Sequence, residues 1–205
     1  DLIVNACASI ESLKATEELM EKYPFVYGAF GIHPDDAEKM TEDTLKEIRR
    51  LCHLPKAVAI GEIGLDYYWH KEEHEHEIQK KMFLAQMEIA REEKLPFMVH
   101  SRDAAKDTLD LVKDCMKGGM YGGIIHCFSY GKEMAQVYLD MGFYLGIGGV
   151  VTFNNGRKLK EVVEYMPLDR IVLETDCPYL SPVPNRGKRN SSLNLPYVAE
   201  AISQI

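Results

Sequence analysis

Short apolar segments and amphipathic helical stretches alternate from one end of the chain to the other. An order of strand, helix, strand, helix is typical of a parallel sheet covered by helices. Strands are expected at 3–6, 26–31, 58–63, 97–100, 124–128, 143–151 and 171–174. Between them, helices are expected at 13–23, 45–51, 73–93, 104–116, 132–141 and 158–166, and a last one begins near Leu195. The alternation therefore predicts an α/β fold.

The number of expected strands favours a (β/α)8 barrel of the TIM type. The pattern yields about seven strands, and eight close a barrel. A ring left open would expose unpaired backbone groups and the core to water. We therefore expect a first βα unit to be missing from this sequence, and the last helix to be cut short. No linker-like stretch interrupts 1–205, so the chain is expected to form one truncated barrel domain.

The chain is acidic, with 24 Lys and Arg residues against 32 Asp and Glu residues and a formal net charge of -8. No overall basic field would attract nucleic acid or anionic lipid. A phosphate-bearing substrate would therefore need local cations.

The five cysteines include no C-x-x-C pair and lie in or beside apolar segments. This usage predicts reduced, buried thiols in a cytoplasmic protein. No apolar run approaches the length that crosses a bilayer, and the start does not resemble a secretory signal. We expect no membrane association, and no protein partner can be inferred.

Potential metal ligands stand at the carboxyl ends of four expected strands. They are Glu62 in AIGEIGLD, His100 in FMVHSRDA, His126 in GIIHCFS and Asp176 in VLETDCPY. Barrel folds place their chemistry at this end of the strands. Carboxylates and imidazoles bind divalent metals that activate water. We therefore expect the four side chains to meet in one mouth and hold metal.

The segment ETDCPYL adds roles to this expectation. Asp176 is expected to bind metal and to accept a proton from the activated water. Glu174 is expected to lie behind it and orient it. Cys127 and Cys177 each follow a ligand by one residue and are expected to point to the other face, where they would only pack.

Two further residues are candidates for binding substrate. His33 in FGIHPDD ends a strand, so it is expected either to donate to a substrate phosphate or simply to terminate the strand before Pro34. Arg102 lies two residues past His100, where it would clamp a phosphate or form a salt bridge at a helix start.

Two charged segments are weaker candidates. HKEEHEHE carries His70 and His74 but does not match H-E-x-x-H, so it is interpreted as the solvated first turn of the long helix. The loop SPVPNRGKRNSSLNLPYV carries Arg186, Lys188 and Arg189. It is expected to be solvated, with guidance of a phosphodiester backbone as the alternative.

The same residues resemble the TatD family of metal-dependent deoxyribonucleases over nearly the whole chain. The matching motifs are GIHP, AIGEIGLDYY, the Q-x-x-x-F-x-x-Q of Gln79, Phe83 and Gln86, P-x-x-x-H-x-R-D-A, HCFS and ETDCPYL. The resemblance implies a (β/α)8 barrel of the amidohydrolase kind that hydrolyses DNA phosphodiesters.

The resemblance also implies two divalent metal ions, with Mg, Mn and Zn all compatible with the ligands. Carried over by motif, Glu62 would bridge the metals and His100 and His126 would hold one of them. Asp176 would bind the other and handle the proton, which makes Asp176 and Glu62 the expected catalytic pair.

The chain departs from the family pattern in three places. The family opens with an H-x-H pair, and no such pair precedes IVNACAS here, in agreement with the strand deficit. Tyr130 stands where HCFSG would have glycine, and RNSSLN replaces an Asn-Glu-Pro-type loop. These changes are expected to shift substrate preference.

Two other functions stay open at this point. The first is an amidohydrolase-type barrel that acts on another ester or amide, such as an aminoacyl ester, since barrels host many chemistries. The second is a chain that naturally lacks the H-x-H strand, binds metal weakly and acts as an interaction partner. Turnover assays on DNA and on ester panels distinguish a nuclease from an amidohydrolase-type enzyme.

Overall fold

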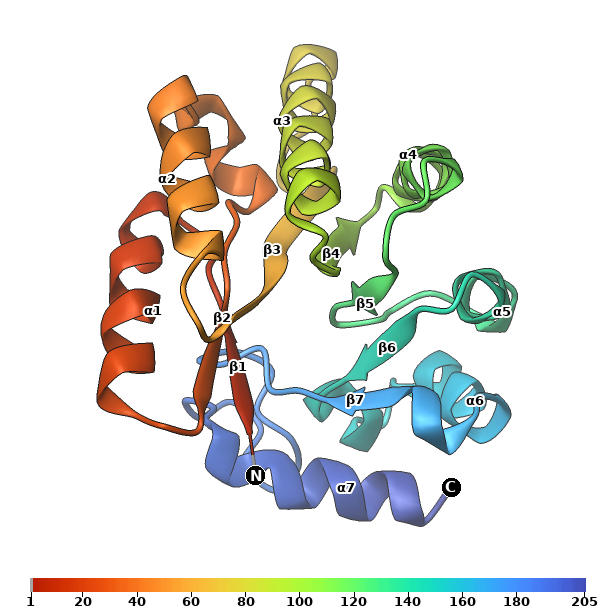
Figure 1. Cartoon of the computed structure of the whole chain (residues 1–205). Helices are drawn as coiled ribbons and strands as arrows, with labels where there is room; N and C mark the ends of the chain where they lie inside the picture. The colour runs from red at the N-terminus through yellow and green to blue at the C-terminus, as the bar shows by residue number, and fades with distance from the viewer. Residues whose placement is uncertain (1) are drawn as a thin grey trace. The chain divides into compact units, whose positions relative to one another are not determined.

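The computed structural model describes residues 2–205, and the chain divides into two compact units, residues 1–123 and 124–205 (Figure 1). The elements of the first unit are β1 (Ile3–Ala6), α1 (Ile10–Lys22), β2 (Val26–Ala29), the 3-10 helix η1 (Pro34–Lys39), α2 (Glu42–Cys52), β3 (Ala57–Asp66), α3 (Glu73–Glu93), β4 (Phe97–Arg102) and α4 (Ala105–Lys117). Strands β1 to β4 pair in sequence order, and every pair is parallel.

The second unit repeats this organisation with shorter strands. Its elements are β5 (Gly123–Ile125), which begins at the boundary, α5 (Lys132–Asp140), β6 (Tyr144–Ile147), the 3-10 helix η2 (Gly149–Thr152), α6 (Arg157–Tyr165), the 3-10 helix η3 (Leu168–Arg170), β7 (Ile171–Leu173), the 3-10 helix η4 (Ser192–Asn194) and α7 (Leu195–Ser203). Strand β6 pairs in parallel with both β5 and β7. The predicted α/β fold with parallel strands is confirmed.

Four expected strands are shorter than the sequence pattern indicated. The strand expected at 26–31 ends at Ala29. The strand expected at 143–151 ends at Ile147, and η2 follows it. The hydroxyl of Thr152 donates to the carbonyl of Gly149 and closes this turn. The strands expected at 124–128 and 171–174 end at Ile125 and Leu173. An apolar run alone does not distinguish a strand from a short buried turn. Because β5 and β7 end early, His126 and Asp176 lie on loops just beyond these strands.

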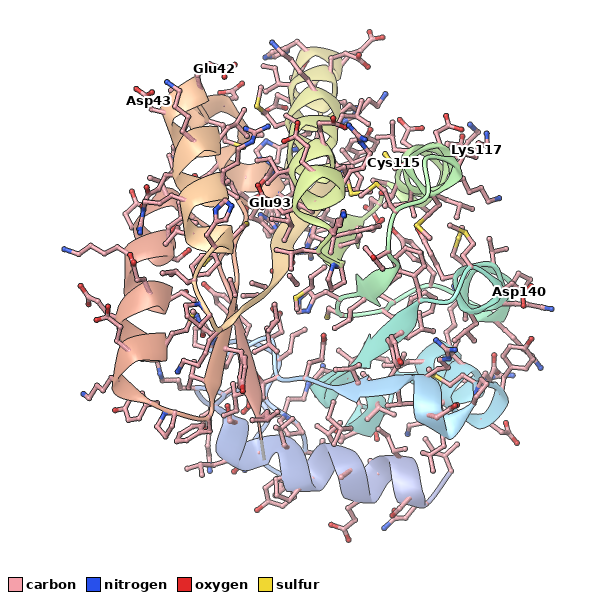
Figure 2. All side chains as sticks on the ribbon, in the orientation of Figure 1. Glu42, Asp43, Glu93, Cys115, Lys117 and Asp140 are labelled. Atoms are coloured by element: carbon pink, nitrogen blue, oxygen red, sulfur yellow. The ribbon has the colours of Figure 1, made fainter. Side chains whose placement is uncertain are left out.

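Local sequence explains where the helices begin. In α1 the side chain of Ser9 accepts from the amide of Ser12, and Ser12 caps Ser9 in return. Such a capping box satisfies amides that have no partner within the helix. The first turn of α2 carries Glu42 and Asp43 (Figure 2), where negative charge offsets the positive end of the helix dipole.

Helix α3 holds the backbone of two other segments in place. Two buried glutamines on α3 contact the main chain of other segments. The Gln79 amide donates to the Asp66 carbonyl at 3.1 Å and its oxygen accepts from the Asp66 amide at 2.9 Å. Gln86 makes the same pair of bonds with Ile32, at 3.1 and 2.8 Å. These pairs satisfy buried backbone groups that no strand partner reaches.

The cysteines are all free, as predicted, but their expected burial is wrong for part of the set. Cys7 and Cys52 are buried, Cys115 on α4 (Figure 2) and Cys127 are half-buried, and Cys177 is exposed. Burial raises the pKa of the Cys7 thiol to about 11 and that of Cys52 to about 12. None of the helices in residues 2–205 is both long and apolar enough to cross a membrane.

Candidate metal centre

The first unit places one carboxylate between two imidazoles. Glu62 lies in β3 and is buried, and His100 lies in β4. Glu62 Oε1 is 2.9 Å from His100 Nδ1 and 4.0 Å from Nε2 of His33. The rings of His33 and His100 meet edge to face with their centroids 4.2 Å apart. Potential ligand atoms of these three residues all lie within 4.8 Å of one another.

A second carboxylate contacts the other nitrogen of His100. Asp66 Oδ2 lies 3.1 Å from His100 Nε2, and Asp66 is almost fully buried. Burial disfavours the charged imidazole, but the hydrogen bonds to Asp66 and Glu62 outweigh it and raise the pKa of His100 to about 9. With Asp66 holding Nε2, Nδ1 is the nitrogen left to share a cation with Glu62. A carboxylate behind a histidine ligand orients the ring in this way in many metal sites.

His33 is fixed by the start of η1. Its Nδ1 lies 3.2 Å from the backbone nitrogen of Asp35 and 3.5 Å from the Asp35 carboxylate. The interaction of the Asp35 carboxylate with His33, opposed by partial burial and assisted by His70, lowers the pKa of Asp35 to about 2. The side chain of His33 is only 14% exposed. The structure therefore groups His33 with possible metal ligands, whereas the sequence analysis left open a contact with substrate or a simple end to the strand.

The second unit holds a comparable group just beyond β5 and β7. His126 Nδ1 lies 2.8 Å from Glu174 Oε2, and His126 Nε2 lies 3.4 Å from Asp176 Oδ1. The amide of Cys127 donates to Glu174 Oε2 at 3.1 Å. His126, Cys127 and Glu174 bring one potential ligand atom each to within 4.8 Å of the others. Glu174 thus supports His126 rather than Asp176, and Cys127 does not simply pack on the opposite face.

The backbone of β6 leaves space for the Glu174 carboxylate. A Cβ atom at Gly146 would lie 2.2 Å from Glu174 Oε2, and one at Gly148 would lie 3.4 Å from Oε1. Glu174 Oε1 is buried and has no hydrogen-bond partner among residues 2–205. A buried carboxylate oxygen that no donor satisfies is costly unless a cation or a proton occupies the space beside it. This oxygen and the imidazole–carboxylate ligand sets fit a divalent metal.

The predicted ligands are divided between the two units. Glu62 and His100 contact each other in the first unit, and His126 approaches Asp176 in the second. That all four hold one pair of metals stays a prediction. Arg102, the other residue predicted to bind substrate, lies at the end of β4 beside exposed aromatic rings.

Sequence reasoning missed Asp66 and the support that Glu174 gives His126. Asp66 stands four residues after Glu62 in the quoted motif AIGEIGLD, so an acidic residue ending a long apolar run was the available signal. The pairing of Glu174 with His126 joins two loops that are far apart in the sequence of the second unit, and no local pattern marks it. Gln79 and Gln86 appeared only as a motif, and the structure supplies their role.

Comparison with known proteins shows which family the chain belongs to. Residues 1–205 match the family described as "TatD related DNase". The uncharacterized metal-dependent hydrolase YabD of Bacillus subtilis is 47% identical over 92% of this chain and 72% of its own length. The 3'-5' ssDNA/RNA exonuclease TatD of Rahnella sp. is 32% identical over 98% of this chain and 78% of its own length.

A solved structure gives the same result for the fold. The crystal structure of YJJV, a TatD homologue from Escherichia coli K12, superimposes with a TM-score of 0.91 at 26% identity, covering 99% of this chain and 78% of that one. The fold and the sequence together define an enzyme of the metal-dependent hydrolase class. The chain belongs to the TatD family.

Proposed function

We propose that this hydrolase cleaves phosphodiester bonds of DNA, using divalent metal held by its imidazole–carboxylate groups. The observation that carries the proposal is the buried Glu62 carboxylate flanked by His33 and His100. Metal at such a site supplies Lewis acidity and lowers the pKa of water. The printed name of the Rahnella relative, a 3'-5' ssDNA/RNA exonuclease, supports a nucleic-acid substrate.

The residues of the chain have separate tasks in this proposal. Glu62 and His100 hold cation in the first unit, and Asp66 fixes the ring of His100. His126 holds cation in the second unit with Glu174 behind it. Asp176, whose side chain is 35% exposed, accepts a proton at a carboxylate oxygen, and His126 Nε2 lies 3.4 Å from its Oδ1. The Arg102 guanidinium contacts a substrate phosphate, as its fork of donors suits two phosphate oxygens.

The test compares end-labelled single-stranded DNA with a panel of carboxylic esters, lactones and aminoacyl esters, in Mg2+, Mn2+ or Zn2+ and in EDTA. We expect metal-dependent cleavage of DNA that Asp176→Asn and Glu62→Ala each reduce by about 100-fold or more. Circular dichroism checks that both variants fold. Asp110→Asn, which changes an exposed carboxylate on α4 that pairs with Lys106, is the matched control.

Turnover of the ester panel without any DNA cleavage would instead assign the chain to amidohydrolase-type ester or amide hydrolysis. Cleavage that persists in EDTA would contradict the role given to metal.

A further inference from the structure

Three aromatic residues, Tyr67, Tyr68 and Trp69, follow β3. The side chain of Tyr67 packs against other parts of the first unit, whereas those of Tyr68 and Trp69 are exposed. The Tyr67 hydroxyl donates to Asp107 at 2.9 Å, and its ring stacks on His76 with centroids 3.6 Å apart. Tyr68 is 43% exposed and Trp69 is 65% exposed. Their rings meet at 86° with centroids 4.7 Å apart. Two large apolar rings thus stay in solvent on a turn that directly follows Asp66, which contacts His100 of the candidate group His33, Glu62 and His100, here called the metal group.

Two cations lie against these rings. The Arg102 guanidinium carbon is 4.0 Å from the centroid of Tyr68 and 5.5 Å from that of Trp69. Lys71 Nζ is 5.3 Å from the Tyr68 centroid and donates to the carbonyl of Tyr67 at 2.7 Å. The guanidinium of Arg102 makes no hydrogen bond or ion pair within residues 2–205, so its donors are available while its position is fixed by the rings.

Asp66 joins this surface to the metal group. Its Oδ1 accepts from the amides of Tyr68 at 2.9 Å and Trp69 at 3.0 Å, while its Oδ2 faces His100 Nε2 at 3.1 Å. Arg102 lies two residues after His100 in β4 and opposite Asp66 in the strand register. The aromatic turn and the metal group are therefore held by the same carboxylate.

We propose that Tyr68, Trp69, Lys71 and Arg102, here called the aromatic–cation platform, bind one unpaired nucleotide of the substrate. The more exposed ring of Trp69 stacks on the base, and Arg102 with Lys71 contacts the adjoining phosphate. Every base has a face that stacks on an aromatic ring, so the platform accepts any sequence. A base paired inside a duplex has both faces covered, so the platform selects single strands or frayed ends.

This proposal deepens the proposed function, on which it rests, and gives it a specificity-determining surface. Arg102 and Lys71 supply local positive charge that attracts a phosphate. A chain with a formal net charge of -8 otherwise repels phosphates. Proteins that bind single strands without sequence preference combine aromatic stacking with cations in the same way.

The test exploits Trp69 as the one tryptophan of the chain. Its fluorescence is followed in Mg2+ while a phosphorothioate-linked oligothymidylate, which resists hydrolysis, is added. The comparison ligands are the same backbone without bases and a blunt duplex. We expect the single strand to quench Trp69, and the baseless backbone and the duplex to leave it nearly unchanged.

Variants are compared by the anisotropy of the labelled ligands. Trp69→Ala is expected to weaken the base-bearing strand by about 5- to 150-fold without affecting the baseless backbone. Trp69→Phe is expected to restore part of the loss. Arg102→Ala is expected to weaken both ligands, and Arg102→Lys to recover less than full affinity. The matched control is Phe25→Ala, an aromatic residue 44% exposed at the amino end of β2.

Equal affinities of the wild type and Trp69→Ala for the base-bearing strand would overturn the proposal, as would equal losses in Phe25→Ala. Cleavage of DNA that is unaffected by Trp69→Ala, with no quenching, removes the platform and leaves the proposed function standing. Quenching by single strands in a protein that cleaves no nucleic acid supports the platform and removes the proposed function.

Discussion

His100 is the residue whose surroundings are most informative, because each of its ring nitrogens faces a carboxylate. Glu62 lies 2.9 Å from Nδ1 and Asp66 lies 3.1 Å from Nε2. Without metal, the two acids stabilise a doubly protonated ring. In the proposed metal site, a cation would replace the proton that Nδ1 shares with Glu62. Proton and metal therefore compete for one place.

The first prediction is a pH dependence of stability in the metal-free protein. The pKa of His100 is raised from 6.5 to about 9. Its contribution to folding is therefore fully present below about pH 6.5 and is lost as the pH rises through about 9, and it amounts at most to something on the order of 3 kcal/mol. Urea unfolding in EDTA at pH 6, 7.5 and 9 measures it.

His100→Gln is expected to flatten this dependence, whereas His53→Gln, which changes an exposed histidine, is expected to keep it. A wild-type profile that is flat or that rises between pH 6.5 and 9 would contradict the assignment of the extra proton to His100.

The second prediction concerns the space beside Glu174. Gly146→Ala places a Cβ 2.2 Å from the present position of Glu174 Oε2. Because the atom it meets ends a flexible side chain, the carboxylate is expected to move while the fold survives, at a cost of about 1–3 kcal/mol. Metal affinity of the His126 group is expected to fall about 10-fold or more. Isothermal titration with Zn2+ measures it.

Gly131→Ala is the comparison for this variant, since a Cβ there meets only the end of Glu133 at 3.2 Å. Unchanged Zn2+ binding in Gly146→Ala would show that Glu174 does not need its present position.

At the scale of elements, α3 holds in place the two segments that carry the candidate metal ligands His33 and Glu62. Gln86 pairs with Ile32, the residue before His33, and Gln79 pairs with Asp66. The two glutamines replace backbone partners that these segments lack. The motif Q-x-x-x-F-x-x-Q therefore has a structural explanation, in which one helix face sets the distance between the loop of His33 and the end of β3.

The third prediction tests this role of α3. Gln86→Met keeps the size of the side chain but leaves the buried amide and carbonyl of Ile32 without partners. The free energy of unfolding is expected to fall by roughly 2–4 kcal/mol, with a loss of metal affinity because His33 is adjacent. Urea unfolding and metal titration measure both effects. Gln136→Met, an exposed glutamine on α5, is expected to change neither.

The sequence predicted the elements better than it predicted their ends. Helix α3 lies where the apolar periodicity placed it, at Glu73–Glu93, because its stripe is long. Strand β6 stops at Ile147 although the apolar run continues. At the site, Glu62 and His100 were predicted as ligands because they end expected strands, but β3 and β4 continue past them to Asp66 and Arg102. The pairing of His126 with Glu174 depends on loops beyond short strands, and no sequence period describes loops.

At the scale of the whole molecule, each unit carries its own imidazole–carboxylate group. The first unit adds the aromatic–cation platform, and the second adds the loop with Arg186, Lys188 and Arg189. In that loop, the Arg186 guanidinium carbon lies 4.2 Å from the Phe153 centroid. Basic residues thus occur in small groups on a chain with a net charge of -8.

The fourth prediction follows from this distribution of charge. If Arg102 and Lys71 supply the phosphate contacts, the logarithm of the binding constant for single-stranded DNA falls with the logarithm of salt concentration with a slope on the order of -1 to -2. Anisotropy titrations between about 50 and 300 mM NaCl measure this slope. A slope of about -4 or steeper would indicate that the loop of Arg186 also binds the backbone.

The turn after β3 is held by its main chain, because Asp66 accepts from the amides of residues 68 and 69 and not from their side chains. Side chains at these two positions are thus free to be exchanged while the anchoring bonds remain. Relatives with the same hydrolytic machinery would be able to acquire new substrate preferences by altering two residues, and a protein engineer can use the same pair as an adjustable module.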